Sequence, residues 1–510
     1  MKIINFLLAL VLFSIAIKAQ QENTLIYGEF DYPKTFAPIS NGQASEYRIA
    51  HLIFDSLLKK TSGNDFIYSI AKDIDVSPNG LSYTFLLQDH LQWNDGTPLT
   101  EKDVEFTLRM ILNPETYNYN SMLSDYIESF ECNRANMITI KLSKPSVDPW
   151  ELFTFPIFPK HKFSNPVLSK DDPFHQNPLG SGAFYIADKQ EKLITLQASP
   201  YNSKSSLKKI IIQFYDDKKE AWDALQQNKI QLVTEIPIGN IKNHPKNIIV
   251  KPYTARYIHI LGINYRNNNS IADLIHQVRF RKLLSNAIDR NLILQKCFQN
   301  NGKIIPGLYP IENLTNETNI VAPLYEEIKM QEELERFMFS QEYERNKSVW
   351  QKQGQEISFS LKYQSGDDEI KNACQEIYKT FKRFGFNVSL LPRSKEEFQD
   401  EVEKNGDFDL AYYTYHFENI MDIFPLLHSG KSKITNFSGY RSTQLEELLL
   451  QLKNSMNPWM IQKYSHQIHK YVVQEQLHLF LWELPSYVAY TERLKNFQAH
   501  SYSLFHFSEN

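Results

Sequence analysis

Residues 91–106 read LQWNDGTPLTEKDVEF and place a turn directly before a helix start. Asp95 and Gly96, followed by Pro98, are typical of a tight turn, because aspartate and glycine tolerate turn conformations and proline fixes its own φ. Thr100 with Asp103 three positions later predicts a helix N-terminus, since the two residues can satisfy each other's backbone N–H groups. The stretch therefore predicts a rigid junction between a turn and a helix.

Strand-like and helix-like segments interleave on both sides of this junction. Trp93 and Val104 supply apolar bulk across it, which indicates packing and not chemistry. Alternating or β-rich runs predict strands at 24–30, 83–87, 137–142, 193–197, 209–214, 257–264, 357–363 and 408–414. Start signals and helical spacing predict helices after Thr100 and Asp217 and over 280–288, 291–297 and 458–473. This order indicates α/β lobes with one β-rich subdomain.

The chain has 510 residues, which exceeds what one hydrophobic core supports, so at least two lobes are expected. Its hydrophobic fraction of 42% and charged fraction of 22% are ordinary for a folded globular protein. The net charge is −4, from 55 Lys and Arg against 59 Asp and Glu. Such a balance supplies no field that would attract a polyanion, so nucleic acid is not an expected partner.

The first twenty residues are typical of a secretory signal peptide. Lys2 is followed by an apolar or small run at 6–17, and Ala19 is a small residue suited to cleavage before Gln20 or Gln21. This run is too short to span a bilayer, so we expect residues 1–19 to be removed and the mature chain to have no membrane span. Because no cysteine follows the run, lipid anchoring is not expected, and the periplasm of a Gram-negative cell is the expected compartment.

No catalytic or nucleotide-binding motif is apparent. The chain has no Gly-x-Ser-x-Gly, P-loop or Gly-x-Gly-x-x-Gly sequence. Cys132, Cys297 and Cys374 are widely separated, so at most one disulfide is possible and buried, inert thiols are expected. His466 and His469 have metal-like spacing, but no third ligand accompanies them, and a solvated helix face is the expectation. The sequence therefore predicts no metal, no cofactor and no enzymatic activity.

The 91–106 stretch resembles the signature of the family 5 extracellular solute-binding proteins, the group that contains dipeptide, oligopeptide and nickel receptors. Further similar segments follow in the family's order over nearly the whole mature chain, at 70–87, 178–184, 216–233, 264, 278–279 and 287–290. The family-motif residues, all expected to be structural, are Trp93, Asp95, Gly96, Asp103, Gly180, Gly182, Asp289 and Arg290. Two positions within 178–184 and the pair at 281–282 depart from the family's pattern.

This resemblance implies a two-lobed periplasmic-binding-protein fold of type II, in the large variety with an extra β-rich subdomain. The first lobe would comprise residues 20–257 and 484–510, with the subdomain inserted near 50–165, and the second lobe would comprise 258–483. Crossing segments near 258–264 and 481–486 would form a hinge that closes on a solute. The resemblance also implies that the protein is the solute-binding component of an ABC importer, which delivers a peptide or peptide-like solute to an inner-membrane permease.

The resemblance places the ligand site in the second lobe. Its candidate residues are Tyr413, Tyr415, His416, Phe417, Glu418 and Asn264. Peptide receptors of the family carry an aspartate that pairs with the peptide's α-amine, and by position His416 replaces it. A buried ammonium needs a carboxylate, so either Glu418 takes this role or the ligand is not an ordinary peptide with a free amine. Tyr413, Tyr415 and Phe417 alternate along an extended segment, where stacking on a ligand and packing in the core are both consistent with the pattern.

Two other interpretations stay open. One keeps the fold and changes the ligand to an oligosaccharide, a metal chelate or a signalling molecule, which the substitution at His416 makes credible. The other interpretation is that the protein is an enzyme, although the sequence contains no recognisable set of catalytic residues. Release of a product from peptides or esters incubated with the protein would support this interpretation.

Overall fold

The computed structural model describes residues 23–38, 43–61, 65–146, 148–202, 206–308, 322, 324–417, 423–429, 436–455, 457–494, 497–499 and 505–507. The chain divides into two compact units, Met1–Thr254 with Tyr487–Asn510 and Ala255–Ser486. Two long strands, β12 (Ile248–Ile263) and β20 (Leu479–Thr491), run from one unit into the other. The predicted signal peptide lies outside the described residues, and the hinge role of the crossings stays a prediction.

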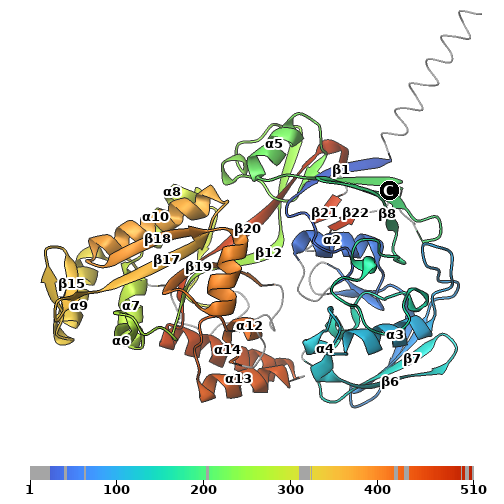
Figure 1. Ribbon diagram of the computed structural model, residues 1–510, viewed down its shortest axis with the longest axis horizontal. Coiled ribbons are helices and arrows are strands. Elements are labelled where there is room, and N and C mark those ends of the chain that lie inside the picture. The colour runs from blue at the N-terminus through green and yellow to red at the C-terminus, as the bar shows by residue number, and fades with distance from the viewer. Residues whose placement is uncertain are drawn as a thin grey trace, which may run out of the picture. The chain divides into compact units, whose positions relative to one another are not determined.

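Unit 1 is built on a mixed sheet in which β11, β1, β10, β9 and β8 are neighbours in that order (Figure 1). β1 is parallel to β10 and β11, whereas β9 is antiparallel to β10 and β8. The elements are β1 (Thr24–Glu29), α2 (Ala44–Ile53), β8 (Phe184–Gln190), β9 (Leu193–Ala198), β10 (Lys209–Phe214), α5 (Lys218–Gln226), β11 (Leu232–Val233), β21 (Phe497–Ala499) and β22 (Phe505–Phe507). Asp217 caps α5, because its side chain accepts a 2.7 Å hydrogen bond from the Glu220 backbone N–H, as the sequence predicts.

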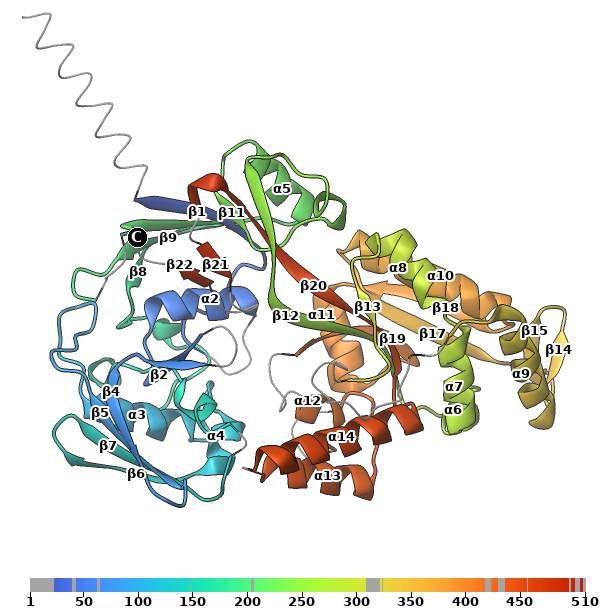
Figure 2. The ribbon, with the colours of Figure 1, turned by 180° about the vertical axis from the view of Figure 1, so that it is seen from behind.

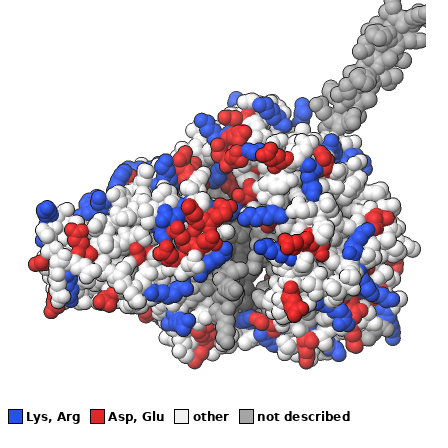
Figure 3. Space-filling view, viewed as in Figure 1, with Lys and Arg blue, Asp and Glu red and all other residues white. Residues whose placement is uncertain are grey.

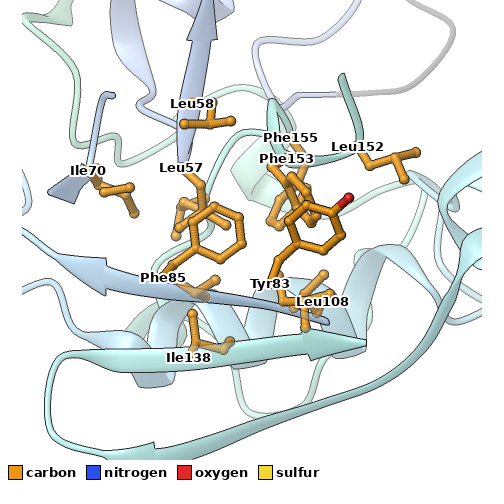
Figure 4. Packing of buried hydrophobic residues seen from close by; sticks show 14 of the residues in the cluster. Leu57, Leu58, Ile70, Tyr83, Phe85, Leu108, Ile138, Leu152, Phe153 and Phe155 are labelled. Atoms are coloured by element: carbon orange, nitrogen blue, oxygen red, sulfur yellow. The ribbon is translucent and has the colours of Figure 1, made fainter. Parts of the chain in front are cut away.

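A β-rich part of unit 1 has its own core. Its sheet has the order β4-β5-β7-β6. The elements are β2 (Leu58–Lys60), β3 (Phe66–Tyr68), β4 (Ala71–Val76), β5 (Ser82–Leu87), α3 (Glu101–Ile111), α4 (Ser121–Tyr126), β6 (Ile127–Arg134) and β7 (Met137–Leu142). Figure 4 shows Tyr83 and Phe85 of β5 directed at Phe153. Their ring centroids lie 4.9 and 4.8 Å from the Phe153 ring, within a cluster that spans residues 57–157.

Unit 2 contains a sheet in which β18, β17, β19, β12 and β20 are neighbours in that order, with β13 beside β20. β17 is parallel to both β18 and β19, and β12 is antiparallel to β19. The strands of this sheet that have not yet been given are β13 (Lys303–Ile304), β17 (Ser358–Gln364), β18 (Asn387–Arg393) and β19 (Leu410–Phe417). A separate sheet has the order β14 (Glu344–Asn346), β15 (Val349–Lys352) and β16 (Gln355–Glu356). Short-range alternation at 257–264 predicted only the end of β12, which begins at Ile248.

Helices cover both faces of this sheet, with α8 and α10 along one face of β17 and β18 and α11 against the other face of β17 (Figure 2). They are α6 (Ala272–Ile275), α7 (Val278–Ala287), α8 (Arg290–Phe298), α9 (Glu327–Ser340), α10 (Asp368–Arg383), α11 (Lys395–Phe398), α12 (Ile423–Leu427), α13 (Thr443–Lys453) and α14 (Pro458–Glu475). α11 continues into a π-helical turn, Gln399–Asn405. Together with the parallel strands, this layering confirms the predicted α/β class.

The surface carries both signs of charge. On the face shown in Figure 3, Lys and Arg side chains lie among Asp and Glu side chains, apart from one group of acidic side chains near the middle. This face therefore offers no continuous basic surface to a polyanion. Within the described ranges, no helix combines the length and the apolar character needed to cross a bilayer.

Candidate functional site

Of the candidate ligand-binding residues, Tyr415, His416 and Phe417 lie towards the carboxyl end of β19, whereas Asn264 lies beside the start of this strand. This strand pairs with β12 in an antiparallel register that sets Tyr413 opposite Ile260, Tyr415 opposite Ile258 and His416 opposite Tyr257. Because β17, β18 and β19 are parallel, their carboxyl ends share one edge of the sheet. Ligands of open α/β sheets bind outside the carboxyl ends of the strands, so this edge is the candidate site.

Tyr413 and Tyr415 lie on the face of β19 that packs into the core of unit 2. The Tyr413 ring stacks on Phe437 at a centroid distance of 4.5 Å and an interplanar angle of 18°. Its hydroxyl donates a 2.9 Å hydrogen bond to Oε1 of Glu403, and burial holds the pKa of this hydroxyl well above its ordinary value. These contacts support core packing for Tyr413, one of the two roles that the sequence left open.

The opposite face of β19 carries Thr414 and His416. Thr414 is exposed and His416 is partly exposed, so this face reaches solvent. The ring of His416 lies 5.3 Å from the ring of Tyr257, measured between centroids. Burial lowers the pKa of His416 to about 4, which keeps its imidazole neutral at pH 7. Alternation along the strand predicts that residues 414 and 416 lie on the same face, but it does not predict which face of the strand is exposed to solvent.

A buried histidine on β12 supports the same face from beneath. His259 is 4% exposed and lies opposite Thr414 in the register. Its Nδ1 lies 3.0 Å from the Tyr412 hydroxyl and 3.3 Å from the Thr414 hydroxyl. Tyr257, His259 and Thr414 were not among the residues singled out from the sequence. These residues come together because β12 pairs with β19, more than 150 positions later in the chain. Local sequence patterns predict the strand at 257–264, but they do not predict which strand pairs with it.

Asn264 is buried, and its side chain forms hydrogen bonds with other groups of the protein. Its side chain is 2% exposed, and its Nδ2 donates 2.7 Å hydrogen bonds to the carbonyl oxygens of Gly406 and Phe408 and to Oδ1 of Asn267. Its Oδ1 accepts a 3.0 Å bond from the backbone N–H of Arg266. These bonds fix the loop that precedes β19, and the ligand-binding role predicted for Asn264 stays a prediction.

Two of the remaining candidates cannot be placed as side chains. Phe417 ends β19 opposite Arg256, and only its backbone position is described. Glu418 lies outside the described residues. Whether it supplies a counter-charge to an amine stays a prediction.

The junction at 91–106 folds as a turn held by its own side chains. The Asp95 carboxylate accepts a 3.1 Å hydrogen bond from the Thr97 backbone N–H, and its Oδ2 lies 3.0 Å from Nε2 of His161 and 3.1 Å from Nζ of Lys162. Burial disfavours its ionisation, but hydrogen bonds from Thr97, His161 and Lys162 hold the pKa of Asp95 well below its ordinary value. Trp93, which is fully buried, donates from its backbone N–H to the Thr97 carbonyl at 2.8 Å.

Asp103 joins the first turn of α3 to the segment around residue 160. Thr100 and Asp103 form the predicted capping box, in which the Thr100 N–H donates to Oδ2 of Asp103 at 2.9 Å. The other carboxylate oxygen accepts a 3.0 Å bond from the Lys160 N–H. Burial raises the pKa of Asp103, which is 5% exposed. The residue therefore acts inside the fold and not on a ligand.

The motif glycines lie where a side chain would not fit. A Cβ at Gly180 would lie 1.9 Å from the carbonyl oxygen of Ile53, the last residue of α2, and one at Gly182 would lie 2.6 Å from the Ile53 carbonyl carbon. Gly96 has a φ of +84°, and a Cβ there would meet the Tyr201 hydroxyl at 2.9 Å. These glycines permit close backbone approach, which explains the motif in structural terms.

Asp289 and Arg290 begin α8. The Asp289 side chain accepts a 2.9 Å hydrogen bond from the Leu292 N–H and so caps the helix. Arg290 is 3% exposed and donates to the carbonyl oxygens of Phe480 and Ser285, each at 2.8 Å. This guanidinium thereby fastens α8 to β20, and burial lowers its pKa to about 10.

The predicted solvated face at His466 and His469 is wrong for His469, which is fully buried. The chain segment at Gly307 packs against it, since a Cβ on Gly307 would lie 2.8 Å from Cε1 of His469. Helical spacing shows which residues share a face of α14, but it does not predict that the segment at Gly307 packs on that face. In the described part of the chain, no group of three or more His, Cys, Asp and Glu side chains is placed to hold a metal.

Known proteins share both the sequence and this architecture. The chain is 22% identical over 498 residues to the "Oligopeptide-binding protein AppA" of Bacillus subtilis, covering 95% of this chain and 90% of the relative. The structure of AppA in complex with a nonapeptide superposes with a TM-score of 0.82 at 20% identity, covering 94% of this chain and 96% of AppA. NikZ from Campylobacter jejuni, in complex with Ni(L-His), superposes with a TM-score of 0.81 at 19% identity, covering 96% and 97%.

These similarities agree in fold with the resemblance drawn from residues 91–106. The sequence model described as bacterial extracellular solute-binding proteins, family 5 middle, matches residues 65–433. That range includes the junction, the motif glycines and β19. The chain therefore belongs to the family 5 bacterial extracellular solute-binding proteins.

Proposed function

We propose that this protein is the receptor component of an ABC-type importer and binds a peptide or peptide-like solute without altering it. One observation carries this proposal: 94% of the chain shares its fold with AppA, whose structure is a complex with a nonapeptide. A curated relative of the same name is described as an oligopeptide-binding protein and covers 95% of this chain. We place the ligand in unit 2 at the edge formed by the carboxyl ends of β17, β18 and β19, because ligands of open α/β sheets bind outside the carboxyl ends of the strands.

Native mass spectrometry of protein purified from the periplasm without refolding tests this proposal. A receptor that binds peptides should carry a ladder of peptide masses, which tandem spectra would sequence. After the bound material has been removed under denaturing conditions and the protein refolded, added peptides should raise its melting temperature, and the rise should increase with the logarithm of the peptide concentration above Kd. Cleaved or otherwise modified peptides, or no peptide at all in either measurement, would contradict the proposal.

A metal chelate is the second candidate ligand. The fold is shared to nearly the same extent with NikZ, whose structure holds Ni(L-His). A neutral imidazole is a common metal ligand, and His416 stands neutral and partly exposed at the candidate edge. Calorimetric titration with Ni²⁺ and L-histidine, alone and together, tests this alternative. Tight binding of the mixture to the wild-type protein, lost in His416→Ala, would favour it over a peptide.

We further propose that the chain is exported to the periplasm of a Gram-negative cell, with cleavage after Ala19 and no lipid anchor. The charged start at Lys2 and the apolar run at 6–17 support this proposal. Cell fractionation followed by intact-mass measurement tests it. The mature protein should begin at Gln20 or Gln21 and carry no acyl mass.

A further inference from the structure

A pocket in unit 1 lies between one face of α5 and the strands β1 and β10. Its volume is about 410 Å³, within the range of small-molecule sites, which is about 300–1,000 Å³. The residues of α5 that line it recur at i, i+3, i+4 and i+7, and so share one face of the helix: Glu220, Asp223, Ala224 and Gln227. Every lining residue belongs to unit 1, whereas the candidate ligand edge belongs to unit 2.

Apolar side chains and one tyrosine ring form part of the pocket lining. Ala224 and Ile230 are 6% and 1% exposed and belong to a core cluster of unit 1, and Ile26 and Tyr215 pack against the same cluster. Gly28 permits this packing, because a Cβ there would lie 2.8 Å from Cδ1 of Ile230 and 3.1 Å from the Tyr215 ring. Since core packing holds these side chains, the apolar surface and the ring need no rearrangement to receive a ligand.

Two carboxylates line the same pocket. Glu220 and Asp223 lie three positions apart on α5, so their side chains are neighbours on the helix surface. Burial, followed by the negative charge of Glu220, raises the pKa of Tyr215. The carboxylate of Glu220 therefore acts electrostatically on the phenol that shares the pocket with it.

The lining carries a net negative charge. Its charged side chains are Glu220, Asp223 and Lys229, so two carboxylates and one ammonium give −1. A second lysine within electrostatic reach of Glu220, Lys192, forms a 2.6 Å ion pair with Asp216. This ion pair commits Lys192 to an acid outside the pocket lining. A ligand with one positive charge would balance the charge of the lining.

A ring, two carboxylates and an apolar surface together match a cation on an apolar stem. The face of a tyrosine ring attracts a guanidinium or ammonium ion through its quadrupole. Carboxylates accept charge-assisted hydrogen bonds from such an ion, and a guanidinium can donate two in parallel. The stem of a long cationic group covers apolar surface, as the side chains of lysine and arginine do in proteins. An uncharged group of the same shape would lack the first two of these interactions.

We propose that this pocket is a second binding site of the protein and takes one guanidinium or ammonium group on an apolar stem. Glu220 and Asp223 bind the charge, Tyr215 stacks on it, and Ile26 and Ile230 contact the stem. Such a group can come from a free alkylguanidine or alkylamine, or from an arginine or lysine side chain of a partner protein. The site does not depend on the peptide-receptor function proposed above, because no residue of unit 2 lines the pocket.

Methyl NMR of the full-length mature protein, labelled at the isoleucine δ1-methyl groups, tests this proposal, because Ile26 and Ile230 line the pocket. Ile26→Val and Ile230→Val assign the two signals. At pH 7.5, butylguanidinium added to about 20 mM should shift both signals, whereas butylurea, a neutral analogue of the same shape, should bind about tenfold or more weakly. Absence of both shifts, or equal binding of the two compounds, would overturn the proposal.

Variants of the lining sharpen the result. Glu220→Gln combined with Asp223→Asn should weaken butylguanidinium about tenfold or more, and Tyr215→Leu should weaken it about threefold. Asp216→Asn is the matched control, because Asp216 is a 77% exposed carboxylate that precedes α5 and pairs with Lys192 outside the pocket lining. The control should bind like the wild type. Full binding by the double variant, or an equal loss in Asp216→Asn, would contradict the proposed site.

Acetyl-Gly-Arg-Gly-amide carries the same guanidinium on a polypeptide and so distinguishes the two sources of the cation. Tighter binding of this peptide than of butylguanidinium, measured at the methyl groups of Ile26 and Ile230, would assign the pocket to an arginine side chain of a partner protein. Tighter binding of butylguanidinium would assign it to a free small cation. Either result supports the cation site, and binding of neither compound contradicts it.

Discussion

The Tyr413 hydroxyl donates a 2.9 Å hydrogen bond to Oε1 of Glu403, and this bond joins the middle of β19 to the π-helical turn Gln399–Asn405. Burial raises the pKa of Glu403, so its carboxylate depends on this donor. π-Helical turns cluster at functional sites, where an inserted residue redirects a side chain. Here the turn anchors one face of β19, while Thr414 on the other face is exposed and Tyr412 on that face is buried.

Tyr413→Phe removes this donor and should lower the free energy of unfolding by about 1–2 kcal/mol, because Glu403 loses a hydrogen bond in a buried setting. Urea denaturation at pH 7.5 measures the change. Tyr68→Phe is the matched control, since Tyr68 is 51% exposed and should lose almost nothing. Equal stability of the two variants would show that the bond contributes nothing.

Gly180→Ala should destabilise unit 1 by more than about 3 kcal/mol, because the new methyl group would overlap the Ile53 carbonyl and the backbone would have to move. Gly354→Ala provides a comparison for backbone strain alone. Gly354 has a φ of +79° but no atom within 4 Å of its would-be Cβ, so about 1 kcal/mol is expected there. Thermal unfolding followed by circular dichroism distinguishes the two, and comparable losses would contradict the steric explanation.

Much of the fold follows from local pattern. Thr100, Asp217 and Asp289 each begin a helix as the sequence predicts, because a capping side chain acts within three residues of its own position. The strands at 137–142 and 209–214 match β7 and β10, since both alternate cleanly. Signals of this kind depend on neighbours along the chain, so they need no knowledge of tertiary contacts.

The candidate site is less predictable from the sequence, because its arrangement depends on contacts between residues that are far apart in the chain. Alternation separates Tyr413 and Tyr415 from Thr414 and His416, but only the packing of Phe437 decides which pair is covered. His469 is buried because the segment around Gly307 folds onto it, a contact between positions more than 150 residues apart. No local pattern contains that information.

Asp103→Ala should cost about 2–4 kcal/mol of unfolding free energy, because the Thr100 and Lys160 N–H groups both lose their acceptor at a site that is 5% exposed. Lys102→Ala, at an exposed position on the same helix turn, should change stability by less than about 0.5 kcal/mol. Chemical denaturation of both variants checks the contrast. A small effect of Asp103→Ala would mean that water replaces the carboxylate without penalty.

Acid should destabilise unit 2 through His478. This residue is 1% exposed and stacks on Phe437 at 5.7 Å. Burial, with a smaller contribution from Arg281, lowers the pKa of His478 to about 3. Because the folded pKa lies below the unfolded value near 6.5, the unfolded state binds the proton first as pH falls. The group therefore costs stability progressively below about pH 6.5, and the loss is complete only below the folded pKa.

Between pH 7.5 and 5.0 this histidine should remove about 2 kcal/mol of unfolding free energy. His478→Gln should reduce the difference between the two pH values by that amount, whatever its effect at pH 7.5. His244→Gln, at an exposed position, should leave the difference unchanged. An identical pH dependence in wild type and His478→Gln would exclude a buried neutral imidazole at this position.

The three cysteines are free thiols, and their reactivity should follow burial. Cys374 is fully buried and Cys297 is 9% exposed, and burial raises the pKa of both. Burial, together with the charges of Glu105 and Glu101, raises the pKa of Cys132 to about 12. Because the thiolate is the reactive form, native protein should react slowly with a disulfide reagent at pH 8, with Cys132 first. In urea all three thiols should react within the same time. Cys132→Ser should abolish most of the slow native reaction, whereas rapid modification of Cys374 in the native protein would mean that α10 opens away from the sheet.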